Sequence, residues 1–358
     1  IVRTVCEVVR EHGAEPFIIP AMGSHGGGTA EGQTALLANL GITEETVGMP
    51  IVSSMDTRVI GTLDDGLPIY CSATALEADG IVVCGRIKPH TSIRGRVESG
   101  LFKMMVVGLG KHRGAAAFHQ RGYPALAQTL LKAGPLFLDR LPVLCGVGIV
   151  ENAFDDTLLV EAIPAHRILE RESQLLELAR ENMPRFLLDE IDVLVVDRIG
   201  KDISGAGMDP NITGRAISPL PIEVKVPVRL ITVLGITPAS HGNATGIGGA
   251  DLTTCGVVES IDWTAMYTNA FTSGALSGSK IPVTVNDDQE AVRMAICCTP
   301  RPDVRDVKVV HIQDTLHMTE IRVSENYLPG LAGCPDIQVL DQGHPFVFDE
   351  TGKLVYDW

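Results

Sequence analysis

The chain has 358 residues, a formal net charge of −15, 45% hydrophobic residues and 4% aromatic residues. The negative charge would repel a phosphate backbone, and so few aromatic side chains give no platform for stacked bases, so a nucleic-acid partner is excluded. The apolar content suffices for real cores, and the length predicts about two domains. Without a signal peptide or an apolar run near 18 residues, we expect a cytoplasmic protein with no membrane partner.

The eight cysteines show no C-x-x-C pair and no metal-finger spacing. Several lie in apolar runs, such as Cys84 and Cys145. We therefore expect the set to behave as buried small hydrophobic residues and not as metal ligands.

The first half of the chain alternates between helical and strand patterns. Residues 1–12 have helical spacing, Phe17 to Pro20 read as a buried strand, and Thr29 is a candidate N-cap for a helix through Leu40. Further elements are strands at 80–84 and 142–150 and a long helix at 164–182. This alternation predicts βαβ units around a mostly parallel sheet.

The same alternation restarts after residue 188, where we place a boundary good to about ten residues. The predicted fold class is α/β, with an N-terminal catalytic and cofactor domain (1–188) and a C-terminal α/β domain (189–358). Both are expected to have mostly parallel, Rossmann-like sheets flanked by helices, with the active site in the cleft between them. The second-half elements are strands at 191–196, 228–234, 281–285 and 307–312 and helices near 262–272 and 287–298.

Two histidines follow predicted strands. His25 comes after the strand at 17–20, and His90 comes after the strand at 80–84. Ligands of open α/β sheets bind at the carboxyl ends of strands, and imidazole titrates near neutral pH. The pair therefore favours acid–base catalysis, and two histidines that merely brace their loops are the alternative.

The first of these histidines stands in a glycine-rich loop, residues 23–28, which precedes a predicted helix. Such a loop suits a phosphate, so Gly26 and Gly27 are candidate cofactor-binding positions. The loop fits neither the Walker pattern nor G-x-G-x-x-G, and the glycines at 146 and 148 lack the third glycine. A standard dinucleotide fingerprint is absent, which disfavours an NAD-dependent dehydrogenase.

Lys103 lies among apolar neighbours. Desolvation disfavours its charge and makes it a candidate nucleophile or attachment point, whereas a lysine reaching out from an amphipathic helix is the alternative. His119 follows 16 positions later, a separation of about 24 Å on one straight helix. If both serve one site, the chain must turn between them, which glycines at 108, 110 and 114 would permit. His112, flanked by Lys111 and Arg113, reads as exposed surface.

The order of four short motifs resembles the N-terminal domain of nickel-dependent lactate racemases over most of residues 1–125. The motifs are A-M-G-S-H-G-G at 21–27, K-P-H at 88–90, G-L-F-K at 100–103, and His119. The resemblance implies an isomerase that racemises or epimerises C2 of a small-molecule 2-hydroxy acid. It also implies that Lys103 tethers the cofactor as a thioamide, that His119 is a nickel ligand, and that His25 and His90 exchange the substrate hydroxyl proton.

The cofactor implied by this resemblance is a nickel-pincer nucleotide, a pyridinium mononucleotide whose thioamide and thiocarboxylate arms hold nickel. It accepts and returns a hydride, which an ordinary side-chain base cannot do for an unactivated C–H bond. Imidazole is a good nickel ligand. The cell would have to supply the enzymes that synthesise this cofactor.

The sequence departs from the family in two places. Lactate racemases have an upstream Asp-x-Thr-Arg-Pro segment, and this chain begins too late to contain it. Arg94 and Arg96 replace a small glycine-rich segment after His90, so we expect a substrate larger or more acidic than lactate.

Polar, glycine-rich loops at 201–211 and 240–251 follow strands of the second domain. Lys201, Asn211 and Arg215 are candidates for binding an anionic substrate or the cofactor phosphate, and ordinary structural turns are the alternative. Two other functions stay open: a non-racemase relative that binds a nucleotide or metal, and, with less support, an NAD-dependent 2-hydroxy acid dehydrogenase.

Overall fold

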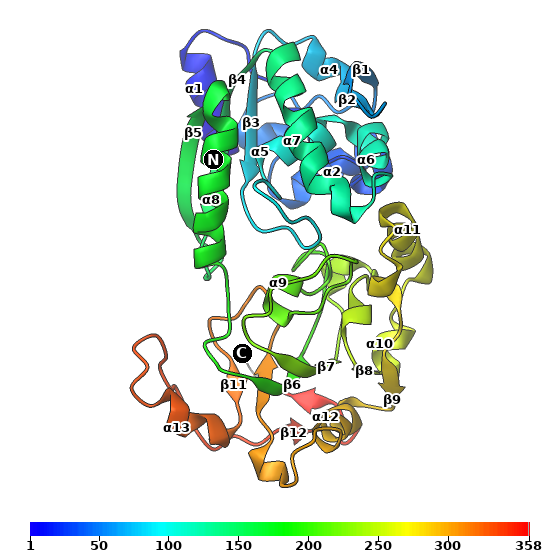
Figure 1. Ribbon diagram of the computed structural model, residues 1–358, viewed down its shortest axis with the longest axis vertical. Helices are drawn as coiled ribbons and strands as arrows, with labels where there is room; N and C mark the ends of the chain where they lie inside the picture. Colours follow the sequence, from blue (N-terminus) through cyan, green and yellow to red (C-terminus); the bar gives the residue numbers. More distant parts are fainter. Residues whose placement is uncertain (357) are drawn as a thin grey trace. The chain divides into compact units, whose positions relative to one another are not determined.

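The computed structural model describes residues 1–356 and 358, and the chain divides into two compact units (Figure 1). Unit 1 consists of Ile1–Glu151 and Thr157–Asn182, and unit 2 consists of Asn152–Asp156 and Met183–Trp358. Each unit contains both helices and strands, which confirms the α/β class.

Unit 1 holds two small sheets and a set of helices. The order β3-β4-β5 forms one sheet, in which β3 and β4 are parallel and β4 and β5 antiparallel, while β1 and β2 form an antiparallel pair. The elements in chain order are α1 (Val2–Glu11), α2 (Ala30–Asn39), α3 (Glu44–Val47), β1 (Thr57–Thr62), β2 (Pro68–Ser72), α4 (Ala73–Leu76), β3 (Ile81–Arg86), α5 (Leu101–Lys103), the π-helix η2 (Met104–Leu109), α6 (Lys111–His119), α7 (Tyr123–Arg140), β4 (Val143–Glu151), β5 (Thr157–Pro164) and α8 (Ile168–Asn182).

The expectation of a mostly parallel sheet is wrong for unit 1. The short connection between β4 and β5 makes them an antiparallel hairpin, whereas a parallel neighbour needs a crossover of a dozen or more residues. The predicted strand at 17–20 is also wrong, because only Ile18 bridges to Ile51 and Phe17 is 37% exposed. The cap is confirmed: the Thr29 hydroxyl accepts a hydrogen bond from Gly32 N at 3.1 Å, and α2 follows.

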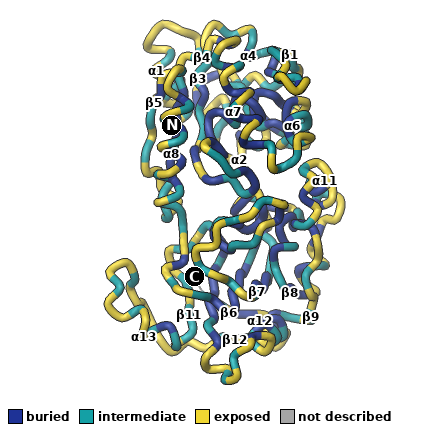
Figure 2. The backbone as a smooth tube through the Cα atoms, viewed as in Figure 1, coloured by how far each residue is buried: buried dark blue, intermediate teal, exposed yellow. Residues whose placement is uncertain are grey.

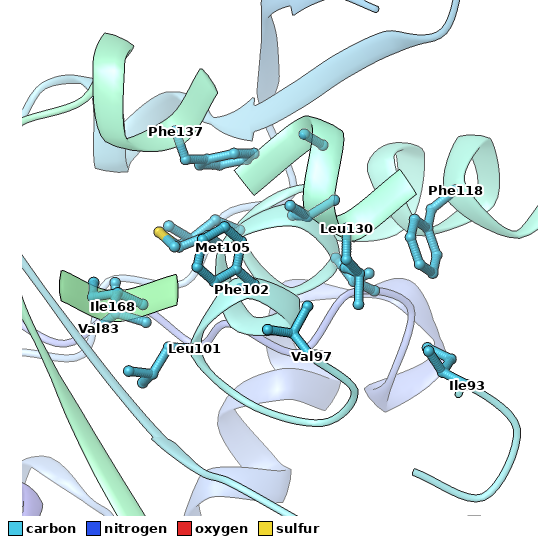
Figure 3. Packing of buried hydrophobic residues seen from close by; sticks show 14 of the residues in the cluster. Val83, Ile93, Val97, Leu101, Phe102, Met105, Phe118, Leu130, Phe137 and Ile168 are labelled. Atoms are coloured by element: carbon cyan, nitrogen blue, oxygen red, sulfur yellow. The ribbon is translucent and has the colours of Figure 1, made fainter. Parts of the chain in front are cut away.

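The core of unit 1 is built around α5 and η2. Leu101, Phe102 and Met105 are fully buried, and Figure 3 shows them gathered with residues of α7 and α8. A Cβ atom on Gly134 of α7 would lie 1.7 Å from Phe102 Cδ1, so only glycine leaves room for this ring. Dense packing therefore fixes the short helix that ends at Lys103.

Unit 2 contains a six-stranded sheet in the order β11-β10-β6-β7-β8-β9. All its pairings are parallel except β10 with β11, so the expectation of a mostly parallel sheet is confirmed here. The elements are β6 (Ile191–Val196), α9 (Pro210–Thr213), β7 (Val228–Val233), β8 (Leu252–Thr254), α10 (Cys255–Glu259), α11 (Trp263–Ser273), β9 (Val283–Val285), α12 (Asp288–Cys297), β10 (Val309–Ile312), β11 (Arg322–Val323), α13 (Leu328–Leu331), β12 (Val347–Phe348) and β13 (Leu354–Val355).

Every residue of β6 is buried, as Figure 2 shows by its colour. A strand covered on both faces reads as an uninterrupted apolar run, which is why the pattern at 191–196 located it. The structure contradicts the cysteine expectation in part, because Cys255, Cys297 and Cys298 are exposed. No helix among the described residues is both long and apolar enough to cross a membrane.

Candidate functional site

The loop that carries His25 depends on glycine. Gly23, Gly26, Gly27 and Gly28 all have positive φ, which other residues adopt only with strain. A Cβ atom on Gly26 would also lie 2.4 Å from the backbone of α2. The loop therefore packs tightly against the start of α2 and leaves the His25 side chain exposed.

The loop that carries His90 wraps around the buried carboxylate of Glu98, which is 1% exposed. Glu98 Oε2 accepts a hydrogen bond from His90 N at 2.8 Å, and Oε1 accepts one from Gly95 N at 3.2 Å. Arg180 of α8 donates to the same Oε1 atom at 2.7 Å. Arg94 donates to the carbonyl oxygens of His90 and Ile93, so its guanidinium helps to hold this loop.

The His90 ring has a defined orientation. Its Nδ1 atom accepts a hydrogen bond from Ser92 N at 2.9 Å, so the neutral ring carries its proton on Nε2. Burial lowers the pKa of His90 well below its ordinary value, and the nearby charge of Lys103 adds to this shift. His90 is therefore neutral at neutral pH and presents an N–H donor at Nε2.

Lys103 is the last residue of α5 and precedes the π-helix η2, a distortion that is frequent at functional sites. Burial, together with a smaller effect from the positive charge of Lys88, lowers the pKa of Lys103 to about 8. An appreciable neutral fraction makes this amine a usable nucleophile near physiological pH.

Glu172 of α8 orients the helix that carries Lys103. Its Oε2 atom accepts a hydrogen bond from Phe102 N at 3.0 Å, where Gly100, the N-cap residue, has no side chain to do so. Burial raises the pKa of Glu172 to about 7, although the backbone N–H groups of Phe102 and Leu101 oppose this rise.

His119 ends α6 and stays neutral. Burial, together with smaller effects from the charges of Lys103 and His25, lowers the pKa of His119 to about 4. His90 also responds to the charges of Lys103 and His119. The structure thus brings His25, His90, Lys103 and His119 into one electrostatic neighbourhood, with a neutral imidazole available as a metal ligand.

The turn expected between Lys103 and His119 is present, but a different residue makes it. Lys111, at the junction of η2 and α6, has φ +53°, whereas Gly110 has φ −65°. Gly108 instead permits close packing, because a Cβ atom there would lie 2.5 Å from Ala21 O. The expectation that His112 is exposed is confirmed, and Arg113 is exposed too, whereas the neighbouring Lys111 is fully buried.

The candidates of the second domain have partners within unit 2. Lys201 donates from Nζ to Gly205 O at 2.7 Å, and burial lowers the pKa of Lys201 to about 8. Asn211 donates to the carboxylate of Asp209 at 2.8 Å, and Arg215 pairs with Asp251 at 2.9 Å. Their role as cofactor or substrate ligands stays a prediction.

The residues of unit 1 fit a metal ion that is already coordinated by an organic cofactor. In the part of the chain that the structure describes, no three His, Cys, Asp or Glu side chains gather to hold a metal ion. A single neutral imidazole, His119, completes a coordination sphere only if a bound organic group supplies the other ligands. The desolvated amine of Lys103 fits the attachment of such a group.

Three supporting residues were missed by sequence reasoning. Glu98 stands four positions before Phe102 in a segment singled out for its apolar company, but nothing local shows that its carboxylate is buried. Glu172 and Arg180 lie in a helix rich in Glu and Leu, a pattern typical of a solvated face. Their contacts span 70 and 82 positions, so no local signal identifies them.

Residues 1–125 match the family model of the lactate racemase N-terminal domain, the domain that holds all four side chains described above. The similarity to lactate racemases therefore covers the N-terminal part of this chain. No curated protein shows significant similarity to the chain.

Two solved structures are similar to this chain. A protein from Thermotoga maritima, a structural genomics target, is 15% identical, with 77% of this chain and 72% of that chain covered and a TM-score of 0.49. The lactate racemase apoprotein from Thermoanaerobacterium thermosaccharolyticum is 14% identical, with 88% and 82% covered and a TM-score of 0.49. The similarity to the lactate racemase family is therefore stated for residues 1–125 alone.

Proposed function

We propose that this protein is a racemase or epimerase that inverts C2 of a 2-hydroxy acid with a nickel-pincer nucleotide attached at Lys103. One observation carries the proposal: a lysine amine and an imidazole, both with lowered pKa values, share one neighbourhood with two histidines from separate loops. The lactate racemase N-terminal domain spans all four.

The bound nucleotide would supply the hydride acceptor that removal of an unactivated C–H hydrogen requires. Lys103 would attach it, and His119 would complete the coordination of nickel. Gly26 and Gly27 are proposed to face its phosphate, with Lys201 and Asn211 as further ligands from unit 2. The arrangement of two Rossmann-like domains around a shared cleft stays a prediction.

The two histidines have unequal starting states for proton transfer. His90 holds its proton on Nε2 and is set to donate a hydrogen bond to the substrate oxygen. His25 is the side chain that accepts the hydroxyl proton. The proton that His25 accepts returns to the substrate oxygen when the hydroxyl group re-forms, so His25 serves both directions.

An exposed cation beside the site suits an acidic substrate. Lys88 lies in the His90 loop, is exposed, and its charge reaches both His90 and Lys103. Arg94 is committed to carbonyl oxygens of its own loop. We therefore assign the attraction of the substrate carboxylate to Lys88 before Arg94.

The test is intact mass and metal analysis of the protein co-expressed with cofactor-synthesis enzymes. We expect about one nickel per chain, as a single attachment site per chain predicts, and added mass on the peptide that contains Lys103. Lys103→Ala should lose both, whereas Lys88→Ala, a matched exposed lysine, should keep both. Loaded protein is then assayed for racemisation of 2-hydroxy acids. Unmodified mass without nickel would instead support a relative that binds a nucleotide or metal without this chemistry.

A further inference from the structure

Lys111 occupies a position that costs the fold stability. Its side chain is fully buried, which is rare for lysine, and its backbone is left-handed with φ +53°. It stands at the turn between η2 and α6, close in sequence to neither Lys103 nor His119. Residues held in such conformations persist when the surroundings require them and often serve function.

The partners of this buried ammonium are neutral. Lys111 Nζ donates to Pro20 O at 2.6 Å and to Gln33 Oε1 at 3.3 Å. Within the described residues, no carboxylate lies within ion-pair distance of Lys111. Burial raises the pKa of the nearby Cys71 thiol to about 12, so this thiol is uncharged as well. The ammonium is therefore satisfied by the oxygens of a carbonyl and an amide and not by a counter-ion.

Gln33 extends this contact to the His25 loop. It is fully buried in α2, and its Nε2 atom donates to Gly23 O at 2.9 Å and to His25 O at 3.3 Å. Pro20, Gly23 and His25 therefore all direct carbonyl oxygens at this buried pair. A loop with four positive-φ glycines has little local preference for one conformation, so such external contacts decide where its histidine lies.

We propose that Lys111 and Gln33 are positioning residues that hold the His25 loop for proton transfer. Lys111 fixes the loop entry at Pro20 and orients Gln33, and Gln33 fixes the carbonyl groups on both sides of Ser24. Because Lys111 also makes the turn between the segments of Lys103 and His119, one residue ties this turn to the His25 loop. The importance of that tie for catalysis rests on the proposed racemase function.

Backbone hydrogen–deuterium exchange of the full-length apoprotein tests the proposal. Gln33→Glu keeps an oxygen facing Lys111 and gives it a counter-ion, but loses the donor to the loop carbonyls. Lys111→Met keeps the aliphatic stem and loses the ammonium. In both variants we expect amides 23–29 to exchange at least about tenfold faster, because local opening is no longer opposed. Arg113→Met, an exposed neighbour on α6, should leave exchange unchanged.

The His90 loop, residues 88–99, is the internal reference. Its exchange should stay at the wild-type rate, since Glu98 and not Gln33 holds it. Unchanged exchange at 23–29, or equal acceleration of both loops, would overturn the positioning role. If Lys111→Met fails to fold, Gln33→Glu decides alone.

Racemisation by cofactor-loaded protein separates this proposal from the proposed function. We expect Gln33→Glu to lower kcat about 10²-fold with KM nearly unchanged, because a displaced catalytic group affects the transition state. Racemisation that is unaffected despite a mobile loop would contradict the positioning role. Wild-type protein that loads nickel but racemises no 2-hydroxy acid would refute the proposed function, whereas the exchange contrast would still establish the contact.

Discussion

The two histidine loops of unit 1 are held in opposite ways. In the His25 loop, backbone carbonyl groups point inward and receive hydrogen bonds from the buried amide of Gln33, which in turn contacts Lys111. In the His90 loop, backbone N–H groups point inward and donate to the buried carboxylate of Glu98. The same problem, fixing an irregular loop, is therefore solved by donors in one place and by an acceptor in the other.

The charge balance of the two arrangements also differs. Arg180 and Arg94 compensate Glu98, at 2.7 Å and 3.8 Å, whereas Lys111 has only neutral partners. A paired buried charge contributes to global stability mainly because losing one partner leaves the other unpaired. We therefore expect damage at Glu98 to appear as unfolding, and damage at Gln33 to appear as local mobility.

The largest expected effect concerns the chemistry of the two loops. His25→Gln should lower kcat for racemisation by about 10²- to 10⁴-fold, because it removes a proton acceptor. His90→Gln should cost only about tenfold, because the amide N–H of glutamine replaces the Nε2–H donor. The rates are measured by chiral chromatography on cofactor-loaded protein. Equal losses would show that both histidines accept protons and would remove this asymmetry.

The stability contrast is tested at Glu98. Glu98→Gln should lower the free energy of unfolding by about 3 kcal/mol, because two arginines lose a buried counter-charge. Glu177→Gln removes an exposed partner of the same Arg180 and should cost less than about 0.5 kcal/mol. Urea unfolding measures both. A loss of similar size at the two positions would mean that the buried contacts of Glu98 stabilise the protein no more than an exposed ion pair does.

The comparison also assumes that the α5–η2 segment, against which both loops are held, is rigid. A substitution at Gly134 tests this assumption. Gly134→Ala should destabilise the protein by about 1–3 kcal/mol through the clash with Phe102, although alanine favours helices. Gly330→Ala, in a helix where a Cβ atom meets nothing within 4 Å, should be neutral or slightly stabilising. Thermal melts of the two variants measure this difference. A stabilised Gly134→Ala would show that the core around Phe102 rearranges to accept the added methyl group.

The last prediction is a pH dependence from the buried ammonium, which has no counter-ion among the described residues. Burial lowers the pKa of Lys111 from 10.5 to about 8 in the folded protein. Between these two values the unfolded chain binds more protons than the folded one, so this group makes stability rise with pH. The unfolding free energy of wild type relative to Lys111→Met should therefore increase from pH 8 to pH 10.5. A flat difference would show that Lys111 is paired in solution.

Local patterns predicted much of this molecule because they encode neighbours along the chain. The apolar run at 191–196 located β6, and Thr29 marked the start of α2, since burial of a central strand and capping of a helix depend on adjacent residues. The apolar pattern gave a wrong prediction at residues 17–20, where the run forms a single bridge and has no strand partner. An apolar run predicts burial, but the presence of a neighbouring strand is decided elsewhere in the chain.

The sequence by itself determined the α/β class, the order of the motifs that resemble lactate racemases, and the need for a turn between Lys103 and His119. Only the tertiary structure decided that Lys111 makes this turn, and that Gln33 and Glu98 hold the histidine loops. The reason is physical: these side chains are polar, and polarity alone predicts exposure. Their burial follows from backbone groups up to 91 positions away that need hydrogen-bond partners, and packing alone brings the two together.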